Sequence, residues 1–213
     1  MGILKNGPLG ALVGTTGGIT SYVLKGQNVT RAKSEPRTKP LSKKQLANCQ
    51  KMTVLNEFFD DILLLLKAGF GIEAKDTKYN YHNIATSYNK INALKGEYPN
   101  IEMDYPKVLI SKGNLMPPEE VTLELVTEGI KFNWHTDGWK YNNGADQAMM
   151  LAFDPENKNV SLVVYGAHRS QGFDVLPLPK KMKNKALETY LSFISADRQT
   201  VATSVYTGQI GEP

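Results

Sequence analysis

Residues 147–165, with the sequence QAMMLAFDPENKNVSLVVY, decide the fold class of this chain. Two apolar and β-branched runs, Gln147–Phe153 and Val160–Tyr165, flank a cluster of turn-forming residues at Asp154–Asn159. Short apolar runs that are bounded by Asp, Asn and Pro are typical of β-strands joined by a turn. The stretch therefore predicts two consecutive strands.

The same pattern recurs along the second half of the chain. Each run is rich in β-branched and aromatic residues, and turn clusters separate the runs. The predicted strands are Lys107–Ser111, Val121–Thr127, Ile130–His135, Gln147–Phe153, Val160–Tyr165, Phe173–Leu178, Ala186–Ser195 and Thr200–Tyr206. Trp134 stands in an early strand, where an immunoglobulin- or fibronectin III-like sandwich often places a core tryptophan. We therefore expect an Ig/fibronectin III-like β-sandwich.

A long helix is predicted between residues 43 and 68. Its apolar residues recur at helical spacing, and Gly69 is the expected stop. The run Ile62–Leu66 is wholly apolar, so we expect it to be buried in a core or in an interface, and we favour the core. A weaker helical pattern follows between residues 82 and 95.

The start of the chain is rich in glycine and predicts a β-hairpin. The runs Ile19–Leu24 and Asn28–Lys33 flank a turn that contains Gly26, and a glycine-rich strand or loop precedes them. An isolated hairpin is marginally stable in water, so we expect it to pack on its own chain or on a neighbour. The predicted class is α+β, with the hairpin, a basic connector and the helices in residues 1–106 and the sandwich in residues 107–213.

Charge is distributed unevenly. Residues 1–51 hold nine Lys and Arg against one acid, whereas residues 52–213 hold sixteen against twenty. Such asymmetry favours contact between the basic segment and something negative. The partner could be a nucleic acid, an anionic surface or the acidic body of another copy.

Several kinds of site are not indicated. One cysteine, Cys49, and three histidines without ligand spacing predict neither an intramolecular disulfide nor a metal site. The glycine-rich start lacks phosphate-loop and dinucleotide motifs, so we expect no cofactor and no small-molecule substrate. His135 and Asp137 lie together at a strand end, but residues this common do not define a catalytic site.

Targeting signals are also weak. No stretch is apolar enough for a transmembrane segment or a secretory signal peptide. We expect synthesis in the cytoplasm, and later export stays open.

A set of motifs extends along nearly the whole chain. It comprises Lys5-Asn6-Gly7-Pro8-Leu9-Gly10 with Gly14 and Gly17, then Val108–Gly113, Phe132-Asn133-Trp134, Arg169, Leu176–Pro179 and Ser204-Val205-Tyr206-Thr207-Gly208. With its glycine-rich start and its S-x-Y-x-G end, the chain resembles a family of uncharacterised proteins of the Bacteroidetes group. That family carries a domain-of-unknown-function label, so the resemblance implies no activity and no catalytic residue.

Together these observations favour a non-enzymatic structural subunit. We expect it to self-assemble through the N-terminal hairpin, into a tube or a filament, with other copies or paralogues as partners. The expected interface residues are Gly10, Gly14, Gly17, Tyr22, Arg31, Lys33 and Arg37. The alternatives are a protein that binds nucleic acid or an anionic surface through the basic segment, a virion structural component, and an enzyme that uses His135 and Asp137.

Overall fold

The computed structural model describes residues 2–4, 10–24, 26–36, 38–75, 77–136 and 143–211. The chain divides into two compact units, Met1–Ser42 and Lys43–Pro213. The first unit is a four-stranded antiparallel sheet with the strand order β1-β2-β3-β4. Its strands are β1 (Gly2–Leu4), β2 (Leu12–Thr16), β3 (Ile19–Leu24) and β4 (Gln27–Ala32). The predicted hairpin is therefore present as β3 and β4, within a larger sheet.

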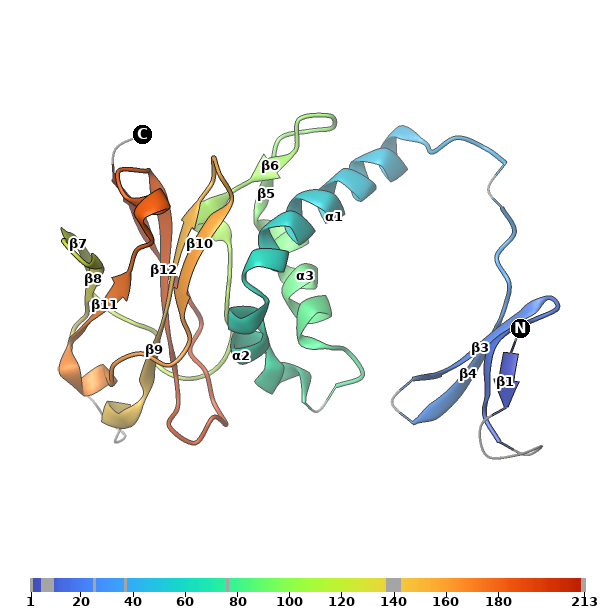
Figure 1. Ribbon diagram of the computed structural model, residues 1–213, viewed down its shortest axis with the longest axis horizontal. Coiled ribbons are helices and arrows are strands. Elements are labelled where there is room, and N and C mark those ends of the chain that lie inside the picture. The colour runs from blue at the N-terminus through green and yellow to red at the C-terminus, as the bar shows by residue number, and fades with distance from the viewer. Residues whose placement is uncertain are drawn as a thin grey trace. The chain divides into compact units, whose positions relative to one another are not determined.

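The second unit consists of a helical layer and two stacked sheets, as Figure 1 shows. Its helices are α1 (Lys43–Asp61), α2 (Leu63–Ala74) and α3 (Tyr81–Asn92), with short 3-10 helices η1 (Tyr105–Lys107), η2 (Asn143–Ala145), η3 (Arg169–Gln171) and η4 (Lys180–Met182). Its strands are β5 (Leu94–Lys95), β6 (Glu102–Met103), β7 (Thr122–Val126), β8 (Gly129–Asn133), β9 (Gln147–Asp154), β10 (Asn159–Val163), β11 (Phe173–Pro177), β12 (Leu187–Ile194) and β13 (Val205–Ile210).

The central sheet, with the order β10-β9-β12-β13, is covered on both faces. Along β9, Met149, Leu151 and Phe153 pack on the helices, and the alternate residues Ala148 and Met150 pack on the smaller sheet β11-β8-β7. Figure 1 shows the helices on one side of the central sheet and β7, β8 and β11 on the other. Burial on both faces explains why β9 is a continuous apolar run without polar alternation.

The predicted boundary between residues 106 and 107 does not coincide with the division of the chain. Leu55 and Phe59 of α1 and Leu66 of α2 share one core with Met149 of β9 and Tyr190 of β12. Helices and sandwich therefore form one body, and the division between compact units falls at residues 42 and 43 instead. An amphipathic helix must bury its apolar face somewhere, and here that face covers the central sheet.

The long helix is interrupted at Ile62, whose backbone leaves the helical conformation between α1 and α2. Gly69 does not end the helix but lies inside α2. Glycine suits this position because a Cβ here would lie only 2.3 Å from the Ile110 carbonyl oxygen. The favoured interpretation, that the whole run Ile62–Leu66 is buried in a core, is also wrong. Leu63 and Leu64 are 40% and 69% exposed, because helical periodicity turns them away from the face that carries their buried neighbours.

Most of the predicted strands are present, and two are corrected. Residues 107–111 form no strand, since the end of η1 is followed by a loop held by side-chain hydrogen bonds. The buried Asn89 clamps this loop, donating from Nδ2 to the Leu109 carbonyl at 2.9 Å and accepting from the Leu109 N–H at 2.9 Å. The last strand begins at Val205 instead of Thr200.

Candidate assembly interface

Tight turns that contain glycine join the long strands of the N-terminal sheet. Gly17 and Gly18 connect β2 to β3, and Gly26 lies in the turn between β3 and β4. Gly17 has a φ of +57°, in the left-handed region that a two-residue hairpin turn favours at its first central position. The turn sets the register in which Thr16 pairs with Ile19.

Tyr22 and Arg31, both expected at the interface, lie on one face of this sheet. Tyr22 pairs with Val29 across β3 and β4, and Arg31 pairs with Thr20. The Arg31 guanidinium carbon lies 6.0 Å from the centroid of the Tyr22 ring, which is a cation–π distance. On the same face, the hydroxyls of Thr15 and Thr20 are 3.0 Å apart. The structure thus brings these two residues into contact.

The other expected interface residues are spread along the same unit. Gly10 comes shortly before β2, and Gly14 lies within β2. The backbone N–H of Lys33 donates to the Gly18 carbonyl at 2.8 Å and extends the β3–β4 ladder. Arg37 lies outside the described residues. The described residues of this set therefore all lie in or beside one sheet.

The N-terminal sheet has no apolar core of its own within the described residues 10–24 and 26–36. The only buried side chain there is that of Ser21, whose hydroxyl lies 2.9 Å from the Thr30 hydroxyl. Ile19, Val23 and Leu24 are 43%, 46% and 55% exposed. Because side chains alternate along a strand, Leu24 projects from the face opposite to Ile19 and Val23. Both faces therefore keep apolar surface that a second body could bury.

β4 also has a free edge. The Lys33 N–H bonds toward β3, and bonding directions alternate along an antiparallel strand. The N–H and C=O groups of Asn28, Thr30 and Ala32 therefore point away from β3. β4 ends the strand order on its side, so no other described strand pairs with these groups. Such an edge is a template for the addition of a further strand.

The suggested catalytic edge holds an exposed ion pair. His135 Nδ1 lies 3.5 Å from Glu120 Oε2, and Asp137 lies outside the described residues. His168 contacts the Ala145 carbonyl through Nδ1 at 3.0 Å. In the part of the chain that the structure describes, no three His, Cys, Asp or Glu side chains are grouped so that they could hold a metal ion.

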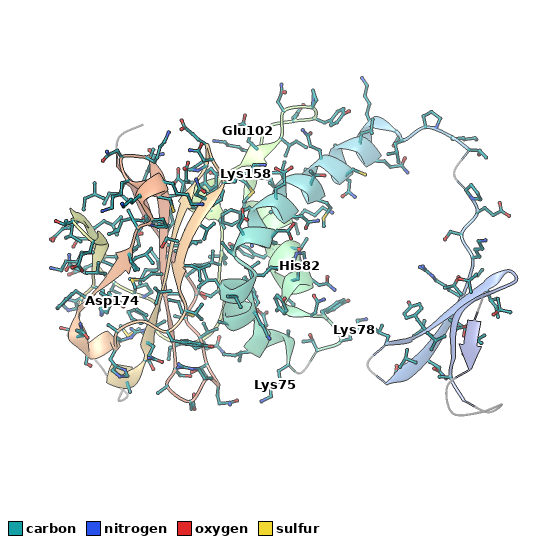
Figure 2. The ribbon with its side chains drawn as sticks, in the orientation of Figure 1. Lys75, Lys78, His82, Glu102, Lys158 and Asp174 are labelled. Carbon is teal, nitrogen blue, oxygen red and sulfur yellow. The ribbon has the colours of Figure 1, made fainter. Side chains whose placement is uncertain are left out.

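A groove of 1160 Å³ runs beside α3 and is lined by residues of α1, α2 and α3 and by Tyr79 and Lys112. His82 lies in it, with Nδ1 3.4 Å from the Thr86 hydroxyl and its ring edge-on to Phe59 at 5.6 Å. Figure 2 shows His82 on the helical layer and Asp174 on the sandwich side of the same unit. These two titratable groups therefore belong to separate environments.

Arg169 and Asp146 form a buried pair that residue patterns alone did not reveal. They are 4% and 5% exposed, and Arg169 Nε lies 3.5 Å from Asp146 Oδ2. The guanidinium carbon stacks 3.9 Å from the Phe193 ring centroid and a terminal nitrogen donates to the Met116 carbonyl. Burial raises the pKa of the Asp146 carboxyl, although the Arg169 charge opposes this shift. We interpret the pair as a structural link, because it joins η3 and the start of β9 to the loop before β7.

None of the helices within the described residues is both long and apolar enough to cross a membrane. No protein of curated function and no solved structure matches this chain. A family model described as a family of unknown function, DUF6266, matches residues 6–208. The match extends from the segment before β2 into β13 and includes both compact units. On this evidence the chain belongs to the family of unknown function DUF6266.

Proposed function

We propose that this protein is a non-enzymatic structural subunit that self-associates through its N-terminal sheet. One observation carries the proposal: the described part of this sheet exposes apolar side chains on both faces and buries none of them. The second unit, in contrast, holds two extensive cores. A small sheet without a core gains stability when a partner buries its apolar surface. Another copy or a paralogue is the partner that we propose.

The proposed contact joins different surfaces of two copies. Each molecule would donate its N-terminal sheet and receive that of a neighbour. A heterologous contact of this kind produces a ring if the rotation closes, and an open assembly if it does not. We propose the open form, such as a tube or a filament.

The charge distribution refines this model. Residues 1–42 contain six Lys and Arg against one Glu, and residues 43–213 contain nineteen against twenty. The body is thus less acidic than the segment 52–213, because Lys43, Lys44 and Lys51 belong to α1. The net charge of residues 43–213 is close to zero, so by itself it would attract the basic N-terminal sheet only weakly. A local acidic surface is therefore the better receiving site, since screening limits attraction to short range.

For the body we propose an Ig/fibronectin III-like sandwich with an added helical layer. The first, second and fifth strands of the sandwich form the sheet β11-β8-β7, and the remaining strands form β10-β9-β12-β13. Trp134 supports this assignment, because it is 5% exposed and packs between the sheets.

Sedimentation velocity over a range of concentrations tests the proposal. We expect the intact chain to form a series of oligomers and residues 43–213 to remain monomeric. The shorter chain keeps both cores and should fold, which circular dichroism and thermal melting verify. A monomeric intact chain at high concentration, or oligomers of the shorter chain, would overturn the proposal.

A matched pair of surface leucines adds a finer test. Leu24 on β3 and Leu64 on α2 are 55% and 69% exposed. Leu24→Ser should weaken association, because it removes apolar surface from the proposed contact, whereas Leu64→Ser should not. Equal effects would argue against the N-terminal sheet as the contact. Labelled DNA added at low and at high salt measures the alternative partner directly.

A further inference from the structure

The sandwich also presents a free strand edge, at β7. This strand ends the order β11-β8-β7, and no further strand among the described residues pairs with its outer side. Four of its five residues are exposed, including Leu125 at 60% and Val126 at 37%. β7 is therefore a second site at which a strand could be added.

The hydrogen-bonding pattern of the sheet shows which backbone N–H and C=O groups of β7 are free to bond an added strand. Directly after β8, the backbone N–H of Trp134 donates to the carbonyl of Gly172, the residue before β11. Because bonding directions alternate along an antiparallel strand, the even-numbered residues of β8 bond toward β11 and the odd-numbered residues toward β7. The odd-numbered Lys131 faces Glu124. The backbone groups of Glu124 are therefore used within the sheet, and those of Leu123 and Leu125 point outward.

The β7 edge is acidic. Residues 119–128, which include β7 and its flanks, contain four glutamates and no Lys or Arg. Several positive groups lie near this segment: Lys131, with Nζ 3.8 Å from Glu124 Oε2, Lys183, whose Nζ donates to the Thr127 carbonyl at 2.8 Å, and His135, which lies near Glu120. Within the strand itself Glu124 is the charged residue, and it is 59% exposed at its side chain. Residues 25–37, which include β4, contain four Lys and Arg and one acid. The two free edges thus carry opposite charge.

We infer that the outer edge of β7 in one copy receives β4 of the next copy. This inference rests on the proposed function and names the receiving surface. The added strand would extend the sheet β11-β8-β7 across the contact. Backbone hydrogen bonds supply the attraction between the edges, and the opposite charges select the partner strand and speed the encounter.

The proposed antiparallel register satisfies the backbone of both edges and gives Arg31 an acidic partner. If Ala32 stands opposite Leu123, the outward-facing groups of the two residues exchange both hydrogen bonds. The same register places Arg31 opposite Glu124 on one face of the extended sheet. Val29 then stands opposite Val126, so an apolar pair follows the ion pair.

The first test removes one outward N–H from β7 of the full-length chain. Leu125→Pro deletes this donor, whereas Leu125→Ala shortens the same side chain and keeps the donor. Both leave the β7–β8 hydrogen bonds intact, because the Leu125 N–H points outward. We expect the proline variant to associate about tenfold more weakly than the alanine variant. Equal association of two folded variants would overturn the inference.

The second test exchanges the charges. Arg31→Glu and Glu124→Arg should each weaken self-association, because each places like charges opposite one another. The double variant restores an opposite pair and should recover most of the association. If the loss of association free energy in the double variant equals the sum of the two single losses, Arg31 and Glu124 do not interact across the contact. That result would reject the register.

A third variant separates failure of this inference from failure of the proposed function. Ala32→Pro removes an outward donor from β4, in the proposed connecting strand. If Ala32→Pro weakens association and Leu125→Pro does not, the N-terminal sheet connects the copies but β7 is not its receiver. If residues 43–213 associate as tightly as the intact chain, the proposed function itself fails.

Discussion

The indole N–H of Trp134 donates to the carbonyl oxygen of Arg169 at 2.8 Å, deep between the two sheets of the sandwich. The same indole packs edge-on against Phe193, with 5.3 Å between ring centroids. One side chain thus joins the end of β8 to η3 and to β12. Its polar atom is satisfied, so the ring can fill the core without an unpaired donor.

Trp134→Ala should destabilise the second unit by about 3–5 kcal/mol, because it leaves a large cavity between the sheets. Trp134→Phe keeps most of the packing and loses the hydrogen bond, so it should cost less, about 1–2 kcal/mol. Urea unfolding followed by circular dichroism measures both. An alanine variant as stable as the native protein would show that this tryptophan does not anchor the core.

Two glycines of α2 should respond in opposite ways to alanine. A Cβ at Gly69 would lie 2.3 Å from the Ile110 carbonyl oxygen, whereas a Cβ at Gly71 would have nothing within 4 Å. Gly69→Ala should cost about 1–3 kcal/mol through overpacking. Gly71→Ala should stabilise the helix by about 0.5–1 kcal/mol. Melting curves that move in the same direction would contradict the close approach at Gly69.

The apolar run at the start of α2 contains a buried and an exposed leucine. Leu66 is fully buried and Leu64 is 69% exposed. Leu66→Asp places an unpaired charge in the core and should cost several kcal/mol, enough to lose the fold. Leu64→Asp should change the free energy of unfolding by less than about 0.5 kcal/mol. Similar expression and melting of the two variants would refute this assignment of helix faces.

Asp154 should make stability depend on pH. Burial alone would raise the pKa of its carboxyl, but hydrogen bonds outweigh burial and hold this pKa below its usual value. They come from the Asn157 side chain at 2.9 Å and from the backbone N–H groups of Glu156 and Asn157. A lowered native pKa stabilises the fold above the unfolded value of about 3.9, and this gain is lost as pH falls through the native pKa.

Asp154→Asn removes this charge and tests the sign. The difference in free energy of unfolding between the native protein and the variant should be largest near pH 6, about two pH units above the unfolded pKa, and should shrink in acid. Urea titrations at several pH values measure it. A difference that grows as pH falls would contradict the prediction.

Local patterns in the sequence predicted many of the elements. The turn residues around Gly26 and the β-prone runs on either side predicted β3 and β4, because short-range backbone preferences decide a hairpin. The alternation around Phe132 predicted β8 and the burial of Trp134. At the candidate interface, Tyr22 and Arg31 were selected from the sequence, and their contact follows from the register of that hairpin.

Other features depend on contacts between distant residues, which no local pattern contains. Asp146 and Arg169 belong to different segments, and only the packing of η3 beside β9 brings them together. The stop expected at Gly69 failed because a glycine in a helix can serve close packing instead of termination, and the neighbour that requires it is Ile110. The position of helices on the central sheet likewise depends on which apolar surfaces meet.

The sequence by itself therefore determined the N-terminal hairpin, most strands of the sandwich and the concentration of positive charge near the start of the chain, since each depends on neighbouring residues. The tertiary structure decided that the helices and the sandwich share one body, that Leu64 faces solvent while Leu66 is buried, and that β4 and β7 lie at sheet edges. Strand order and burial are properties of the packed chain, because they depend on which surfaces exclude water together.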